Sequence, residues 1–161
     1  MKFNGRQFVA GVQIVDGVCG LYFLLTRALP AIHTTREKIL ASGFTVLCIL
    51  SIAAGILLWQ SLSQGYRLSV LVQLAQLPVI VSARLAYDVG IGARAVFGVT
   101  RPFSFLLHFS FSGAMDVGFG TSSYVLTYGV NVVALALLIF LVVTRRNITR
   151  ILEEKAIRDR T

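Results

Sequence analysis

Four long runs of apolar residues, separated by polar stretches, organise this chain of 161 residues. The runs cover residues 8–25, 39–62, 68–86 and 124–144. A helix needs roughly 20 predominantly apolar residues to cross the hydrocarbon core of a bilayer. The lengths of the four runs therefore predict four transmembrane helices.

Between the third and fourth runs, in residues 87–119, apolar side chains recur at every second position. These positions carry odd numbers and include Phe103, Phe105, Phe109 and Phe111, whereas the even positions are mostly Gly, Ser, Arg, His and Asp. In an extended chain, side chains two positions apart lie on the same face. The pattern therefore predicts strands with one apolar face and one polar face.

The odd numbering of the apolar positions also selects the register of a hairpin. A three-residue loop at 112–114 would place Phe111 opposite Met115 and keep all the apolar side chains on one face. The segment 88–99 could add a third strand, although the glycines within it weaken a strand. We therefore expect a β-hairpin or a three-stranded meander.

Small residues mark one face of the second run. Cys48, Ser51 and Gly55 are three and four positions apart, so they share one side of a helix. Small residues at this spacing let two helix backbones approach closely, which is how membrane helices commonly associate. This face is expected to pack against another helix.

The composition favours an integral membrane protein. Hydrophobic residues make up 56% of the chain and charged residues only 14%, against about 25% charged residues in a typical soluble domain. No polar linker or repeat divides the sequence. We therefore expect a single integral membrane domain over residues 1–161.

The net charge of +8 bears on orientation in the membrane. The basic residues flank the apolar runs and form no stripe with interleaved aromatics, so a nucleic-acid partner is not expected. With four spans, nine Lys and Arg residues lie on the side of the two termini and six on the other side. The positive-inside rule then predicts cytoplasmic termini, in a cytoplasmic (inner) membrane.

These patterns together predict a membrane all-α fold. It is a bundle of four transmembrane helices with a small extracytoplasmic antiparallel β-hairpin, or three-stranded meander, between the third and fourth helices. A charged cytoplasmic tail covers residues 145–161. The prediction is thus of a multi-pass four-helix bundle.

The strongest candidate site is a set of polar residues inside the apolar runs, because polar groups in a bilayer are costly. The predicted intramembrane cluster consists of Asp16, Gln13, Gln73, Gln76 and Asn131. One interpretation is interhelical hydrogen bonding that fixes the packing, worth roughly 0.6 kcal/mol per bond. The other is a site for a ligand, an ion or a proton.

The predicted sheet supplies a second set of candidates. The phenylalanines at 103, 105, 109 and 111 are expected to anchor the sheet to the bundle or to lipid. His108 and Asp116, at even positions, are expected on its outward polar face. Any function outside the membrane would then use the even positions or the strand edge.

The sequence carries no motif of known catalytic chemistry. It lacks a nucleophile elbow, a phosphate-binding loop, a zinc-protease motif and a dinucleotide fingerprint. His33 and His108 are isolated, and Cys19 and Cys48 lie within apolar runs, so no metal site is predicted. We expect no enzymatic activity and no cofactor.

The function predicted from the sequence is therefore a non-enzymatic binding or assembly module that presents a β-sheet outside the membrane. Membrane lipids are the expected environment, and a protein partner could join by strand addition or as a homo-oligomer. The main alternative is an oligomeric small-solute or proton-coupled transporter that uses Asp16. A third interpretation, a lipid-modifying enzyme, would use His108 and Asp116.

Overall fold

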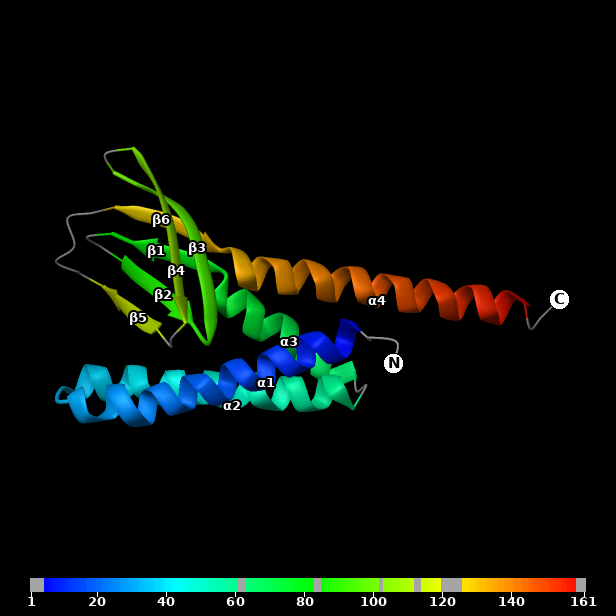
Figure 1. Ribbon diagram of the computed structural model, residues 1–161, viewed down its shortest axis with the longest axis horizontal. Helices are drawn as coiled ribbons and strands as arrows, with labels where there is room; N and C mark the ends of the chain where they lie inside the picture. The colour runs from blue at the N-terminus through cyan, green and yellow to red at the C-terminus, as the bar shows by residue number, and fades with distance from the viewer. Residues whose placement is uncertain are drawn as a thin grey trace.

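The computed structural model consists of a helical layer and a curled sheet that lies against it (Figure 1). The residues described are 5–60, 63–82, 85–101, 103–111, 114–119 and 126–158. Within these ranges there are four α-helices: α1 (Gly5–Phe23), α2 (Thr35–Trp59), α3 (Ser63–Gln76) and α4 (Val132–Arg158). A π-helical turn, η1 (Leu24–Ala28), and a 3-10 turn, η2 (Leu29–Ala31), follow α1.

The described strands form one antiparallel sheet of six strands. They are β1 (Pro78–Val81), β2 (Leu85–Gly90), β3 (Ala93–Thr100), β4 (Ser104–Phe111), β5 (Ala114–Phe119) and β6 (Thr127–Asn131). Their order in the sheet is β4-β3-β6-β1-β2-β5. The sheet therefore takes strands from the predicted third run, the alternating stretch and the predicted fourth run.

Helices α1 and α2 form a closely packed antiparallel hairpin. A Cβ at Gly55 would lie 2.7 Å from the backbone oxygen of Ala10, and one at Gly17 would lie 2.8 Å from that of Cys48. Cys48, Ser51 and Gly55 are all buried, which confirms the predicted packing face of the second run. The start of α2 is fixed by a capping box, in which Thr34 and Glu37 bond each other's backbone N–H groups.

The predicted third transmembrane helix is wrong. Residues 68–86 contain the last nine of the 14 residues of α3, then β1 and the beginning of β2. Pro78 cannot donate the backbone hydrogen bond that would continue the helix, and the β-branched residues that follow it favour a strand. The polar face expected on this helix does exist in α3, where Gln73 and Gln76 are buried.

The predicted fourth transmembrane helix is also wrong in its first part. Thr127–Asn131 forms β6, and α4 begins at Val132 because Asn131 Oδ1 accepts hydrogen bonds from the backbone N–H groups of Val133 and Ala134. The apolar part of α4, Val132–Arg145, is about 21 Å long, shorter than a bilayer core of about 30 Å.

Only two helices in the described ranges are long and apolar enough to cross a membrane, Gly5–Thr26 and Thr35–Trp59. The multi-pass four-helix bundle with a small hairpin is therefore contradicted. The protein combines a two-helix hairpin, two further helices and a sheet of six strands.

The predicted hairpin between β4 and β5 does not form, because these strands lie at opposite edges of the sheet. β4 pairs instead with β3, from Ala93↔Phe111 to Thr100↔Ser104. Both strands have eight residues and only three residues separate them, so they pair along their whole length. The expected strand at 88–99 is divided between β2 and β3.

Two short connections force the sheet to curl. β2 and β3 are joined by two residues, and so are β4 and β5, so the ends that they join lie within about 11 Å of each other. In a flat sheet of this strand order the joined ends of β2 and β3 would be about 14 Å apart. The joined ends of β4 and β5 would be about 24 Å apart. The sheet therefore closes at this end into a cup with an inner and an outer face.

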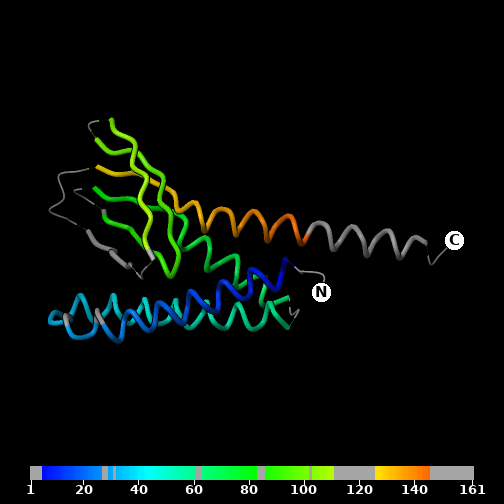
Figure 2. Tube along the Cα trace, viewed as in Figure 1, coloured from blue at the N-terminus to red at the C-terminus, as the bar shows by residue number. Residues whose placement is uncertain are grey.

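The closed end of the cup lies against the helical hairpin (Figure 2). Ile91, in the turn between β2 and β3, is buried in a cluster with Leu24, Phe44 and Cys48. Leu24 directly follows α1, and Phe44 and Cys48 belong to the first part of α2. The sheet thus lies beside the hairpin, level with its middle and one of its ends.

Candidate functional site

The inner face of the cup combines polar residues with glycines and valines. On β3, Arg94, Val96 and Gly98 are buried, and the register places Thr127 and Asn131 of β6 on the same face. Both of these β6 residues are buried as well. The polar side of these strands therefore points into the protein.

The outer face is apolar and, over half of the sheet, exposed. The side chains of Phe97 on β3 and Phe105 and Phe109 on β4 are 51%, 83% and 70% exposed. Tyr128 and Val130 continue this exposed surface on β6, and the ring of Phe97 stacks on that of Phe105. The distribution of polar and apolar residues is thus reversed relative to a water-soluble sheet.

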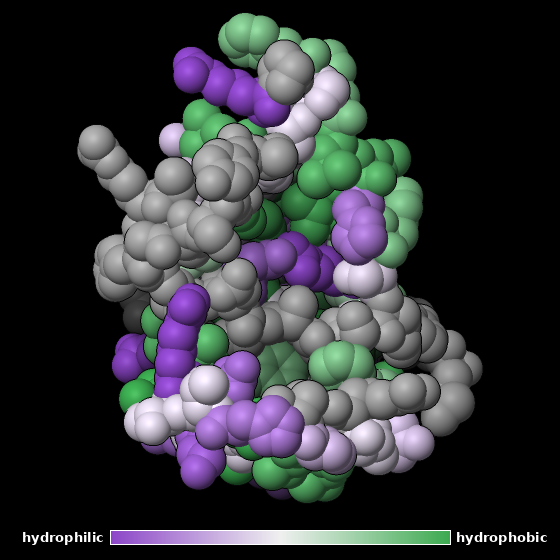
Figure 3. Space-filling view, turned by 90° about the vertical axis from the view of Figure 1, so that its left-hand side faces the viewer, coloured by the Kyte–Doolittle hydropathy of each residue, from purple (hydrophilic) through white to green (hydrophobic). Residues whose placement is uncertain are grey.

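The view onto the sheet end of the molecule illustrates this distribution (Figure 3). Hydrophilic side chains lie across the middle of this surface, and hydrophobic side chains lie above them and to the right. Further hydrophilic side chains lie at the upper edge and along the lower left of this view.

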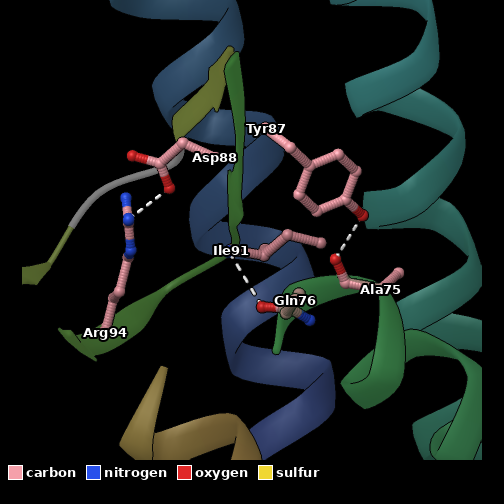
Figure 4. A network of polar contacts seen from close by, with 6 residues as sticks. All are labelled: Ala75, Gln76, Tyr87, Asp88, Ile91 and Arg94. Carbon is pink, nitrogen blue, oxygen red and sulfur yellow. Dashed lines mark hydrogen bonds and ion pairs between the residues drawn. The ribbon is translucent and has the colours of Figure 1, made fainter. Parts of the chain in front are cut away.

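A part-buried ion pair lies inside the closed end of the cup. The Nη2 atom of Arg94 pairs with Oδ1 of Asp88, which comes from the end of β2 (Figure 4). The Arg94 side chain lies over Gly90, where a Cβ would be 2.7 Å from Arg94 Cδ. Arg94 is only 6% exposed, and its Nε atom has no hydrogen-bond partner among the described residues.

The two residues predicted on the outward face, His108 and Asp116, occupy inner-face register positions on the edge strands β4 and β5. His108 is opposite Val96 in the ladder of β3 and β4, and its side chain is exposed. Asp116 is opposite Asp88 in the ladder of β2 and β5; its side chain lies outside the described part of the structure. The register thus places Asp116 beside Asp88 in the sheet.

Asp16 binds the turn that closes the cup. Its Oδ1 atom accepts a hydrogen bond from the backbone N–H of Ala93 at 3.2 Å. Gly92, the preceding residue, has a φ of +69°, and a Cβ there would lie 2.0 Å from the same oxygen. Only glycine combines this left-handed conformation with so close an approach of the carboxylate.

Helix α3 holds the same turn from another direction. The Oε1 atom of Gln76 accepts a hydrogen bond from the backbone N–H of Ile91 at 3.0 Å, and the Tyr87 hydroxyl donates to the carbonyl of Ala75 at 2.6 Å (Figure 4). Asp16 and Gln76, which the sequence placed in one polar cluster, therefore act on one turn.

Gln13 lies one helical turn from Asp16 and links the three helices. Its Oε1 atom accepts a hydrogen bond from the Ser69 hydroxyl at 2.7 Å, and its backbone oxygen accepts one from Ser51 at 3.0 Å. Its Nε2 atom has no partner among the described residues. These hydrogen bonds join α1 to α2 and α3, and the choice between a packing role and a ligand, ion or proton site stays a prediction.

The remaining two members of the predicted cluster have separate places. Asn131 joins β6 to α4: its backbone N–H donates to the carbonyl of Leu77 at 2.9 Å, and its side chain caps α4. Gln73 is buried on the same face of α3 as Gln76. All five residues of the predicted cluster are buried, but they lie at different contacts between the helices and strands.

The predicted sheet anchors do not pack on the helices. Phe103, Phe105 and Phe109 are between 70% and 91% exposed, and the side chain of Phe111 lies outside the described residues. The outer face meets the helices at β2 instead, where Val89 is buried. Anchoring to lipid, the other expectation for these phenylalanines, stays a prediction.

The sequence interpretation missed the Arg94–Asp88 pair. Both residues have even numbers within the alternating stretch, so their common face could be predicted. Their proximity could not, because the turn at Ile91–Gly92 was read as part of one strand. The signal that could have revealed it is the sequence Gly90-Ile91-Gly92, since paired glycines commonly mark a turn.

The described residues contain no group of three or more His, Cys, Asp or Glu side chains that could hold a metal ion. The polar groups of the inner face can instead form hydrogen bonds and ion pairs with a polar ligand. Comparison of the chain with protein-family models, with curated proteins and with solved structures finds no match.

Proposed function

We propose that this protein is a membrane-embedded, non-enzymatic binding module, in which the α1–α2 hairpin and the outer face of the sheet lie together in the bilayer. The observation that carries the proposal is the reversed sheet: exposed Phe97, Phe105 and Phe109 outside, and buried Arg94 and Thr127 inside. Strands with apolar residues outside and polar residues inside are typical of sheets that face lipid.

The contacts between sheet and hairpin support the same placement. Asp16 is the twelfth of the 19 residues of α1, and it bonds the turn between β2 and β3. If α1 crosses a bilayer, this turn lies near the middle of the hydrocarbon core. A sheet wholly in water would leave only the first part of α1 in the membrane.

The exposed surfaces of the helices are apolar, as is the exposed surface of the sheet. Apolar side chains of α1, including Val15, Val18 and Tyr22, are more than half exposed, as are several of α2. Transfer of a Leu or Phe side chain out of water contributes about 1.5–3 kcal/mol. Lipid around both elements would therefore stabilise the described surface without any rearrangement.

The distribution of basic residues suggests an orientation. α1 begins and α4 ends at the same end of the molecule (Figure 1). Arg145 of α4 lies over the ring of Tyr66 near the start of α3, 4.8 Å from its centroid. By the positive-inside rule, we assign this end to the cytoplasmic side of an inner membrane.

Cysteine accessibility tests the placement. In a background with Cys19→Ser and Cys48→Ala, Phe105→Cys reports on the outer face and Gln64→Cys on the exposed start of α3. In vesicles opened by freeze–thaw, a charged maleimide should label the Gln64→Cys variant and spare the Phe105→Cys variant until SDS is added. Equal labelling of both variants in vesicles would refute membrane embedding of the sheet.

Transport of a small polar solute or of protons is the second candidate. Arg94 favours it, because a buried guanidinium with an unpaired Nε lies inside a face shielded by apolar residues. A carrier would show proton or solute flux in proteoliposomes that Arg94→Gln abolishes. A binding module would show no flux above that of protein-free vesicles.

A further inference from the structure

The unpaired edge of β4 is in conflict with the proposed membrane placement. β4 is an outermost strand, and its second edge has no partner strand among the described residues. Roughly half of the backbone N–H and C=O groups of such a strand point away from its neighbour. Lipid offers these groups no hydrogen bonds, so an open edge at bilayer depth must be covered.

The strand β4 has no side chains of the kinds that prevent pairing with another strand. Natural edge strands are commonly protected by charged residues, especially lysine, or by proline. The strand Ser104–Phe111 contains neither, and His108 is its one titratable residue. Phe103, Phe105 and Leu107 expose more than half of their side chains beside this edge.

The sequence of the strand identifies its partner. Residues 103–111 read Phe-Ser-Phe-Leu-Leu-His-Phe-Ser-Phe, which is the same in both directions except that Leu106 corresponds to His108. In an antiparallel pair with its centre at Leu107, each residue lies opposite its symmetric counterpart. Phe105 then faces Phe109, and the phenylalanines and Leu107 of both copies stay on the outer face, with Leu106 opposite His108 on the inner face.

We infer that β4 pairs with β4 of a second copy of this chain, across a twofold axis at Leu107. A twofold interface must be self-complementary, and a palindromic strand meets this requirement directly. Main-chain hydrogen bonds along the two edges supply the contact, and the phenylalanines of the two copies lie side by side on the outer face that meets lipid. The inference deepens the proposed function and rests on it.

Disulfide cross-linking tests the pairing and its register. In the background with Cys19→Ser and Cys48→Ala, Leu107→Cys places two thiols opposite each other, within the Cα separation of 4.4–6.8 Å that a disulfide requires. Phe105→Cys alone places them about 14 Å apart by strand geometry. Mild oxidation in native membranes should therefore give a homodimer with the first variant and several-fold less with the second.

Mixed variants provide the matched control. Co-expression of a Phe105→Cys chain with a differently tagged Phe109→Cys chain should give a heterodimer that either chain alone does not give. Leu107 is 59% exposed, so its substitution leaves the packing of the single chain intact. Single-molecule photobleaching of the unsubstituted protein in nanodiscs should independently show two copies.

The outcomes separate this inference from the proposed function. Photobleaching of single copies with no cross-link, while the Phe105→Cys variant stays protected from the maleimide, overturns the dimer and leaves the lipid-facing sheet. Efficient cross-linking with equal maleimide labelling of Phe105→Cys and Gln64→Cys overturns the membrane placement alone. Cross-linking of Leu107→Cys to a different protein would also overturn the dimer.

Discussion

The Asp16 carboxylate accepts a hydrogen bond from the backbone N–H of Ala93 at 3.2 Å, across 77 positions of sequence. This contact joins the middle of α1 to the turn where the sheet closes. It connects the two parts of the protein that the sequence suggested were separate, the apolar helices and the alternating strands. The stability of the described fold should therefore depend strongly on this junction.

Gly92→Ala should destabilise the protein by at least about 2 kcal/mol. A non-glycine residue in the left-handed region costs roughly 1–2 kcal/mol, and the added Cβ would also displace the Asp16 carboxylate. Denaturant unfolding in detergent measures the change. The control is Gly11→Ala on α1, where a Cβ meets no atom within 4 Å and helix propensity favours alanine by about 0.5–1 kcal/mol.

Asp16→Leu should be more harmful than Asp16→Asn. Leucine removes the acceptor of the Ala93 N–H, and leaving a buried donor unpaired costs about 1–3 kcal/mol. Asparagine keeps a carbonyl oxygen of the same reach, so most of the stability should remain. Equal unfolding midpoints for these two variants would show that the hydrogen bond does not hold the turn.

Asp88→Asn should destabilise the sheet because it leaves the guanidinium of buried Arg94 without its counter-charge. Loss of one partner of a buried pair costs about 3–5 kcal/mol. Since Asp88 is 26% exposed, we expect about 2 kcal/mol. The double variant Arg94→Gln with Asp88→Asn should lose less than the sum of the single variants, and strict additivity would argue against the pair.

Gly98→Ala should disturb the centre of the sheet. A Cβ at Gly98 would lie 2.6 Å from the backbone oxygen of Tyr128 on the neighbouring strand β6. The strands would have to separate, so the amide hydrogens of β3 and β6 should exchange faster while those of α1 and α2 stay protected. Unchanged exchange in β3 would mean that the two strands are less close than described.

The strands were the part of the fold that the sequence predicted best. The odd positions of the alternating stretch do share one face, because the two-residue period of an extended chain fixes this locally. Which strands pair was not predictable in the same way. Phe111 can extend the apolar face with Met115 or with Ala93, and the choice depends on the whole β3–β4 ladder.

The apolar runs were less informative than their length suggested. The segments around Val79 and Val130 are apolar enough for a membrane helix, but they form the two central strands of the sheet. A continuous apolar run is compatible with a buried strand as well as with a helix. Pro78 and Gly129 were the local signs of a strand.

The sequence indicated which residues belong to the candidate site, but it did not indicate which groups those residues contact. Gln13, Asp16 and Gln76 stand among apolar residues in the sequence, and all three are buried in the structure. Their partners are backbone groups of the turn and side chains of other helices, which no pattern in the sequence indicates. Arg94 was overlooked because its counter-charge is defined only once the sheet curls.

The most direct test of the central claim, that the outer face of the sheet meets lipid, is tryptophan quenching by lipids brominated on their acyl chains. The single native tryptophan is removed by Trp59→Phe, and a new one is introduced by Phe105→Trp or, as the inner-face control, by His108→Trp. We predict strong quenching of the Phe105→Trp variant and at least about twofold weaker quenching of the control. Water-like emission from the Phe105→Trp variant without quenching would contradict the account.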